Sequence, residues 1–270
     1  MTEQSPAARI AQKAKRWVVK VGTSELTDGR GGKVTPQRVQ AVASHIADLW
    51  KEGKEAVLVT SGAIGIGMGV LELAARPQEL AKLQAAAATG QSKLMQWYTA
   101  QLEERGFHAA QVLLTREDME DPKRSQNVKA TLETLLKARI VPIINENDTV
   151  STEEIRYGDN DILSARVAML IGAEVLVLLT DVEKLVGPGG APLDHVRRSD
   201  MTPALEQAAR GTDKESSTGG MKTKIEAAKL AMGQGIPLAV MTTAGFVKLI
   251  KISGAGAQAH AEPQGTWFLP

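Results

Sequence analysis

The chain has 270 residues, of which 43% are hydrophobic and 23% are charged, and its 32 basic and 31 acidic residues give a formal net charge of +1. This length suits one large α/β domain or two smaller ones. The balanced charge excludes a global field that would attract nucleic acid or an anionic membrane, so we expect neither partner. The chain contains no cysteine, which excludes disulfides, thiolate metal ligands and a thiolate nucleophile and favours a cytoplasmic protein.

Short apolar runs alternate with longer helical patterns along the chain. After a polar extension at residues 1–15, strands are predicted at 17–21, 56–60, 109–114, 140–144, 175–180 and 238–241. Their nearly continuous apolar character is typical of parallel strands that are buried on both faces. The predicted fold class is therefore α/β, with a mostly parallel central sheet sandwiched by helices.

Three of the helical patterns carry clear start and stop signals. Pro36 occupies the first helical position of one helix, and Gly53 ends it. A second helix is predicted after Pro77. A third begins near Asn160 and closes at Gly172. These helices lie between predicted strands, as the βαβ interpretation requires.

Several predicted strands end in polar, glycine-rich turns, and ligands of parallel sheets bind beyond the carboxyl ends of the strands. The turn residues are Lys20, Gly22, Thr23 and Ser24, then Thr60, Ser61, Gly62, Ala63 and Gly65, then Asn145 to Asp148, and finally Thr180 and Asp181. Each turn alone has an ordinary turn composition. A lysine at the end of a buried strand needs an anionic partner, however, and the whole set therefore indicates an anion site.

A glycine-rich loop precedes a helical pattern near the C-terminus. Its residues are Thr218, Gly219, Gly220, Met221, Lys222, Thr223 and Lys224. Backbone amides in such a loop can approach phosphate, and the helix dipole and a lysine in the first turn add positive charge. The spacing of a Walker A loop is absent, and no Rossmann G-x-G-x-x-G follows the first strand. Taken alone, the loop is equally compatible with a flexible surface loop before a basic helix.

The residues present suit phosphoryl transfer, which needs alignment and positive charge more than covalent help. Lys20 and Lys224 supply the charge, and Asp161 is a candidate for holding both ammonium groups. Amide turns at Gly22 and Gly62 would neutralise the transferring group, and Mg²⁺ would bridge the nucleotide phosphates. A carboxylate acceptor is already ionised at neutral pH and needs no general base. We assign no direct metal ligand.

Seven sequence strings carry the most specific signal. They are VVKVGTSEL from Val18, VTSGAIGIG from Val59, LLTREDMED from Leu113, VPIINENDTV from Val141, GDNDILSA from Gly158, LLTDVEKL from Leu178 and TGGMKTK from Thr218. With these strings in this order, the chain resembles the glutamate 5-kinases (γ-glutamyl kinases) of the amino acid kinase superfamily over nearly its whole length. The resemblance implies a single amino acid kinase domain at 16–270, with an N-terminal glutamate lobe and a C-terminal nucleotide lobe. Many members continue into a PUA domain, which we expect this chain to lack.

The resemblance also implies a role for each matching residue. The glutamate ligands would be Ser61, Asp148 and Asn160. Lys20 and Lys224 would stabilise the transferred phosphoryl group, and Asp161 would orient them. The ATP site would comprise Lys20, Thr180, Asp181, Thr218, Gly219, Gly220, Met221, Lys222, Thr223 and Lys224.

The reaction implied by the resemblance is ATP-dependent phosphorylation of the γ-carboxylate of L-glutamate to L-glutamate 5-phosphate, the first step of proline biosynthesis. The implied partners are proline as a feedback inhibitor, a homo-oligomer that is a dimer or tetramer, and glutamate-5-phosphate reductase. Members of the family often have a longer loop at the position that residues 187–192 occupy in this chain.

Two alternatives differ in kind: one is another amino acid kinase, and the other is a non-catalytic protein. An acetylglutamate, aspartate, carbamate or uridylate kinase would share the lysines and glycine turns, but NENDTV followed by GDNDILSA supplies the acids and amides that suit an amino acid's ammonium group. A nucleotide acceptor would favour more arginine there. A non-catalytic amino-acid sensor would be expected to have lost at least one of Lys20, Asp161 and Lys224, and all three are present.

Overall fold

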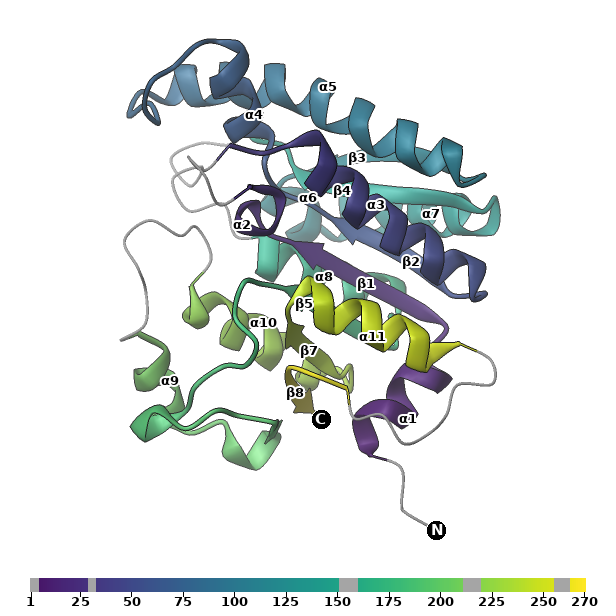
Figure 1. Ribbon diagram of the computed structural model, residues 1–270, viewed down its shortest axis with the longest axis vertical. Coiled ribbons are helices and arrows are strands. Elements are labelled where there is room, and N and C mark those ends of the chain that lie inside the picture. The colour runs from purple at the N-terminus through teal and green to yellow at the C-terminus, as the bar shows by residue number, and fades with distance from the viewer. Residues whose placement is uncertain (1–4, 29–32, 151–159, 211–219, 255–262) are drawn as a thin grey trace. The chain divides into compact units, whose positions relative to one another are not determined.

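The computed structural model describes residues 5–28, 33–150, 160–210, 220–254 and 263–270 (Figure 1). The chain divides into two compact units. Unit 1 comprises residues 1–20, 48–56 and 161–270, and unit 2 comprises residues 21–47 and 57–160. Of the helices in the described ranges, none combines the length and the apolar character that a membrane span requires.

Eight strands form a mostly parallel sheet in the order β3-β4-β2-β1-β5-β7-β8-β6. Their bounds are β1 Arg16–Val21, β2 Glu55–Val59, β3 His108–Leu114, β4 Ile140–Glu146, β5 Val175–Leu179, β6 His195–Arg197, β7 Leu238–Met241 and β8 Thr266–Leu269. Strands β2 and β3 pair parallel with β4, β5 pairs with β7, and β6 pairs with β8. The β7–β8 pair is antiparallel.

The six predicted strands are all present, with ends that differ by one or two residues at most. Strand β5, with the sequence VLVLL, is buried at every position, as expected for a parallel strand covered on both faces. The short strands β6 and β8 were not predicted. The prediction of an α/β fold with a mostly parallel sheet is confirmed.

Helices flank the sheet. The described α-helices are α1 Pro6–Lys13, α2 Thr23–Leu26, α3 Pro36–Lys51, α4 Ala63–Val70, α5 Leu80–Glu104, α6 Arg116–Glu120, α7 Pro122–Lys137, α8 Asn160–Ile171, α9 Pro203–Arg210, α10 Met221–Gly233 and α11 Thr243–Ser253. Two short 3-10 helices are η2 Pro188–Gly190 and η3 Arg198–Asp200. Helices α3, α5 and α8 correspond to the three predicted ones. Gly53 and Gly172 follow α3 and α8 with φ of 75° and 62°, the left-handed conformation that ends helices.

In unit 1, the polar N-terminal segment contains a helix that packs on α11. The small side chains of Ala7, Ala8 and Ala11 on α1 are 0–1% exposed. Ser5 caps this helix by accepting a hydrogen bond from the Ala8 N–H. Lys54 Nζ donates a hydrogen bond to the Gln12 carbonyl at 2.8 Å. Residues 6–13 are therefore held in the fold by packing and by polar contacts.

In unit 2, α4 and α5 run side by side at a backbone-to-backbone contact (Figure 1). A Cβ on Gly67 would lie 1.8 Å from the Ala86 carbonyl oxygen, and one on Gly90 would lie 1.8 Å from the Ala63 carbonyl oxygen. Such approaches are impossible, so both positions require glycine. This contact fixes α4, whose N-terminus follows the turn at Gly62.

Replacement of Gly90 tests this contact. Because a Cβ there must push α4 away from α5, Gly90→Ala should lower the free energy of unfolding by about 2–3 kcal/mol or more. Gly69→Ala is the matched control, since Gly69 also lies in α4 and has open space around the added methyl group. The control should be neutral or stabilising by up to about 1 kcal/mol, because alanine favours helix. Urea denaturation of both variants gives the answer, and equal stabilities would contradict the proposed close contact.

Candidate active site

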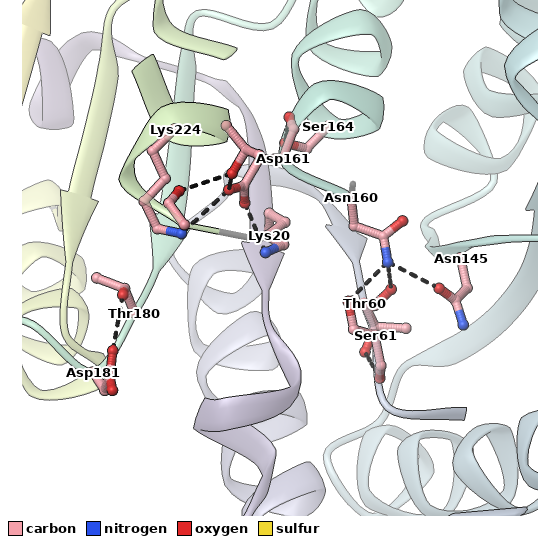
Figure 2. A network of polar contacts seen from close by, with 12 residues as sticks. Lys20, Thr60, Ser61, Asn145, Asn160, Asp161, Ser164, Thr180, Asp181 and Lys224 are labelled. Atoms are coloured by element: carbon pink, nitrogen blue, oxygen red, sulfur yellow. Dashed lines mark hydrogen bonds and ion pairs between the residues drawn. The ribbon is translucent and has the colours of Figure 1, made fainter. Parts of the chain in front are cut away.

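Three buried charged side chains of unit 1 form one cluster (Figure 2). Lys20 lies near the end of β1, Asp161 in the first turn of α8, and Lys224 in the first turn of α10. Lys20 Nζ lies 2.7 Å from Asp161 Oδ1, and Lys224 Nζ lies 3.2 Å from Asp161 Oδ2. Thr223 Oγ1 donates a hydrogen bond to the same Oδ2 at 2.8 Å. The structure thus brings together the three charged residues predicted to act on phosphate.

The three charged side chains of this cluster are buried. Asp161 is fully buried, and Lys20 and Lys224 are only 4% and 7% exposed. Burial by itself would raise the pKa of Asp161, but attraction to Lys20 and Lys224 outweighs burial and lowers the pKa to about 2. Asp161 is therefore ionised at neutral pH. This one carboxylate contacts two ammonium groups, and ammonium groups can also bind an anion such as phosphate.

The start of α10 offers a second attraction for an anion. The helix begins at Met221, directly after Gly220, and has no side-chain cap among the described residues. The helix dipole at this start favours negative charge. Lys222 is exposed on the same turn. Thr218 and Gly219, the other predicted loop residues, lie outside the described residues.

Thr180 and Asp181 directly follow β5 in unit 1. The Thr180 N–H donates a hydrogen bond to the Met241 carbonyl of β7 at 3.0 Å, and Thr180 is buried. Its Oγ1 donates to Asp181 Oδ1 at 3.3 Å (Figure 2). Asp181 itself is exposed. The backbone at this point is fixed by the sheet, while the carboxylate remains accessible.

In unit 2, the buried side-chain amide of Asn160 contacts three hydrogen-bond acceptors (Figure 2). Asn160 Nδ2 lies 2.8 Å from the Thr60 carbonyl oxygen, 2.8 Å from Ser61 Oγ and 3.2 Å from Asn145 Oδ1. Asn160 Oδ1 is buried and has no hydrogen-bond partner among the described residues. A buried acceptor of this kind needs a donor, because leaving it unpaired costs free energy.

A second layer of polar side chains holds this amide cluster. Asn145 Nδ2 donates to Gln91 Oε1 at 2.9 Å, and Gln91 Nε2 donates to Gln111 Oε1 at 3.1 Å. The Thr60 and Tyr98 hydroxyls lie 2.8 Å apart, and burial raises the pKa of Tyr98, which stays neutral. Sequence reasoning missed Gln91, Gln111 and Tyr98. These residues can be recognised only from the three-dimensional structure, because a single glutamine or tyrosine in a helical or strand pattern does not indicate a binding site.

Gly62 opens α4 with a left-handed φ of 102°. A Cβ there would lie 3.2 Å from Leu26 Cδ1 and 3.3 Å from Val34 Cγ2. Both the backbone conformation and the tight space therefore favour glycine. As in α10, the described residues provide no side-chain cap for α4, nor for α2, which follows Gly22. The helix dipole at the start of α4 favours an anion there.

Asp148 lies in the turn after β4 and is half-buried. Burial raises its pKa to about 6, and the positive charge of Arg76 opposes this rise. Asp148 makes no hydrogen bond to the amide cluster among the described residues. A nearby cation would lower the raised pKa of this carboxylate, because the cation stabilises its ionised form.

Comparison with known proteins shows the family to which this chain belongs. The profile of the amino acid kinase family matches residues 15–242, most of the chain. The chain belongs to the amino acid kinase family. A carbamate kinase from Giardia has a similar structure, with a TM-score of 0.66 over 95% of this chain and 99% of that one. The two sequences are 17% identical, so this likeness concerns the fold alone.

Sequence relatives of this amino acid kinase carry a more specific name. A protein named glutamate 5-kinase from Symbiobacterium thermophilum is 48% identical over 230 residues, which are 83% of this chain and 86% of that protein. A second glutamate 5-kinase, from Moorella thermoacetica, is 43% identical over 274 residues, which span all of this chain and 70% of that protein. A third, from Neisseria gonorrhoeae, is 40% identical over 96% of this chain and 86% of that protein.

The Asp161 carboxylate of this amino acid kinase provides a test that needs no ligand. Its pKa of about 2 lies below the ordinary 3.8, so its ionised form stabilises the folded state above pH 4, and this contribution is lost as the pH falls towards 2. Asp161→Asn removes the charge between two buried lysines and should cost about 3–5 kcal/mol at neutral pH. The difference between the unfolding free energies of the two proteins should be constant from pH 7 to 5 and should become smaller in more acid solution. A pH-independent difference down to pH 3 would show that the charge is not the cause.

Proposed function

We propose that this amino acid kinase transfers the γ-phosphate of ATP to the γ-carboxylate of L-glutamate and forms L-glutamate 5-phosphate. The observation that supports this most strongly is the buried cluster in which Lys20 and Lys224 share the single carboxylate of Asp161. Relatives named glutamate 5-kinase at 40–48% identity support the choice of acceptor. The reaction is the first step of proline biosynthesis.

In the proposed mechanism, the two lysines stabilise charge that spreads over the phosphoryl oxygens as the bond to ADP breaks. Asp161 orients both ammonium groups toward the phosphate and does not itself react. The acceptor carboxylate is ionised at neutral pH and attacks without a general base. The chain therefore contributes alignment and charge, as phosphoryl transfer requires.

The nucleotide would be held by unit 1. We assign Thr180, Asp181 and residues 218–224 to the ATP site, with the N-terminus of α10 facing phosphate. Both oxygens of Asp161 are already engaged by the lysines, so this carboxylate fits poorly as a magnesium ligand. Mg²⁺ would instead be held by the nucleotide phosphates, where it supplies additional positive charge.

L-Glutamate would be held by unit 2 through Ser61, Asn160 and Asp148. The unpartnered Asn160 Oδ1 suits an ammonium donor, and the ionised Asp148 carboxylate suits its charge. The Ser61 hydroxyl and the first amides of α4 suit a carboxylate. This set contains acceptors for the cationic end of an amino acid and donors for its anionic ends.

The proposed product indicates where the enzyme works and with which partners. An acyl phosphate hydrolyses readily, which favours a cytoplasmic enzyme that works with a glutamate-5-phosphate reductase. We also propose that the chain forms a dimer or tetramer and that proline, as the pathway end product, inhibits it.

A hydroxylamine-trapping assay tests the reaction. Purified protein, ATP, Mg²⁺ and L-glutamate should give ADP and hydroxamate in equal amounts. Lys224→Ala should lower kcat by about 10²–10³-fold, because it removes a donor to the developing charge. Lys229→Ala is the matched control, since Lys229 is an exposed lysine on the same helix that pairs with Glu206. Its kcat should equal that of the unaltered protein.

The other outcomes of this assay are equally informative. Hydroxamate formed with aspartate or acetylglutamate but not with glutamate would keep the chemistry and change the acceptor. Binding of ATP and glutamate without turnover would support an amino-acid sensor instead.

The raised pKa of Asp148 gives a pH-dependent prediction for the acceptor site. Only the ionised carboxylate can attract the substrate ammonium group, so the KM for glutamate should be constant above pH 7. Below the pKa of about 6, it should rise about tenfold for each pH unit. Asp148→Asn should have a high KM for glutamate that does not change across this range, and the KM for ATP should stay the same. A KM for ATP that follows the same pH curve would assign the titration to another group.

A further inference from the structure

The segment after β5 is attached to the sheet at two points. At its start, the Thr180 N–H donates to the Met241 carbonyl of β7 at 3.0 Å. At its end, the Leu185 N–H donates to the Thr266 side-chain oxygen of β8 at 2.9 Å. The four residues between these anchors, 181–184, include the exposed Asp181. The position of that carboxylate therefore depends on both anchors.

Thr266 makes the second anchor through its hydroxyl group alone. Its Oγ1 accepts from the Leu185 N–H and donates to the Leu193 carbonyl at 2.6 Å, and Thr266 is fully buried. The Leu193 N–H in turn donates to the Leu185 carbonyl at 2.8 Å. One hydroxyl thus satisfies a buried donor and a partly buried acceptor from the two ends of the 185–193 turn. A methyl group in its place would leave both unpaired.

The neighbours of Thr266 show that its position is closely determined. Gly265 has a φ of 101°, and a Cβ there would lie 2.4 Å from the Val240 carbonyl oxygen. The Trp267 N–H donates to the Asp194 carbonyl at 2.8 Å. The Asp194 carboxylate pairs with Lys184, the last residue before the second anchor. Strand β8 therefore holds both ends of the turn through consecutive residues.

We propose that Thr266 is a positioning residue for the nucleotide: by fixing Leu185, it holds the 181–184 segment in the conformation that binds ATP. This inference rests on the proposed assignment of Thr180 and Asp181 to the ATP site. Thr266 does not touch the nucleotide. It acts by removing alternative conformations of the segment before binding, so that less conformational entropy is lost when ATP binds.

The test compares Thr266→Val, which keeps the shape but loses the hydroxyl, with Thr266→Ser, which keeps the hydroxyl. Thr266→Val should raise the KM for ATP and the dissociation constant for ADP about tenfold. The KM for glutamate should not change, and Thr266→Ser should restore the nucleotide affinity. Calorimetric titration with ADP provides the binding readout without turnover. If Thr266→Val does not fold, Thr266→Ala, which also lacks the hydroxyl, answers the same question.

Two further variants separate the possible failures. Ser253→Ala removes another buried hydroxyl of unit 1, which donates to the Ile250 carbonyl within α11, and should leave ADP affinity unchanged. Asp181→Ala should weaken ADP binding if the nucleotide assignment is right. Normal affinity in Thr266→Val together with weak affinity in Asp181→Ala would overturn the role of Thr266 and leave the ATP site in place. Normal affinity in both variants would overturn the ATP-site assignment itself.

Discussion

One buried carboxylate shared by two buried ammonium groups is the constraint on which unit 1 depends. Lys20, Asp161 and Lys224 come from a strand and from two helices far apart in the sequence. Two buried positive charges repel each other, and their desolvation is costly, so the cluster is tolerable only because Asp161 lies between them. Both ammonium groups contact the same carboxylate, which distinguishes this cluster from a simple buried ion pair.

The helix starts differ in whether a side chain caps them. Helices α1, α6, α7 and α11 begin with side-chain caps from Ser5, Thr115, Asp121 and Thr242. Helices α2, α4 and α10 begin after glycine, and their described surroundings supply no such cap. A missing cap costs about 1 kcal/mol of stability. The strings VVKVGTSEL, VTSGAIGIG and TGGMKTK include the starts of these three helices, whereas α5, which follows Glu79, lacks a side-chain cap without such a string.

The sequence was most informative where one residue conflicts with its local surroundings. Lysine at the end of an apolar strand and aspartate at the start of an apolar helix both need a partner, and this need predicted the charged cluster correctly. Strands β6 and β8 are too short for a periodic signal. Gln91 and Thr266 could not be predicted, because each is an ordinary residue in its own segment. Their importance comes from partners 54 and 81 residues away in the chain.

In the first turn of α8, two adjacent residues belong to two different clusters of side chains. Asn160 belongs to the amide cluster of unit 2, and Asp161 belongs to the charged cluster of unit 1. Consecutive side chains on an α-helix leave the axis about 100° apart, so one backbone can serve two sets of partners. The spacing between them cannot change, however, because one inserted residue would rotate Asp161 away from both lysines. The order of these two residues is therefore fixed by their separate partners, which explains why an asparagine and an aspartate, both ordinary helix-capping residues, make tertiary contacts here.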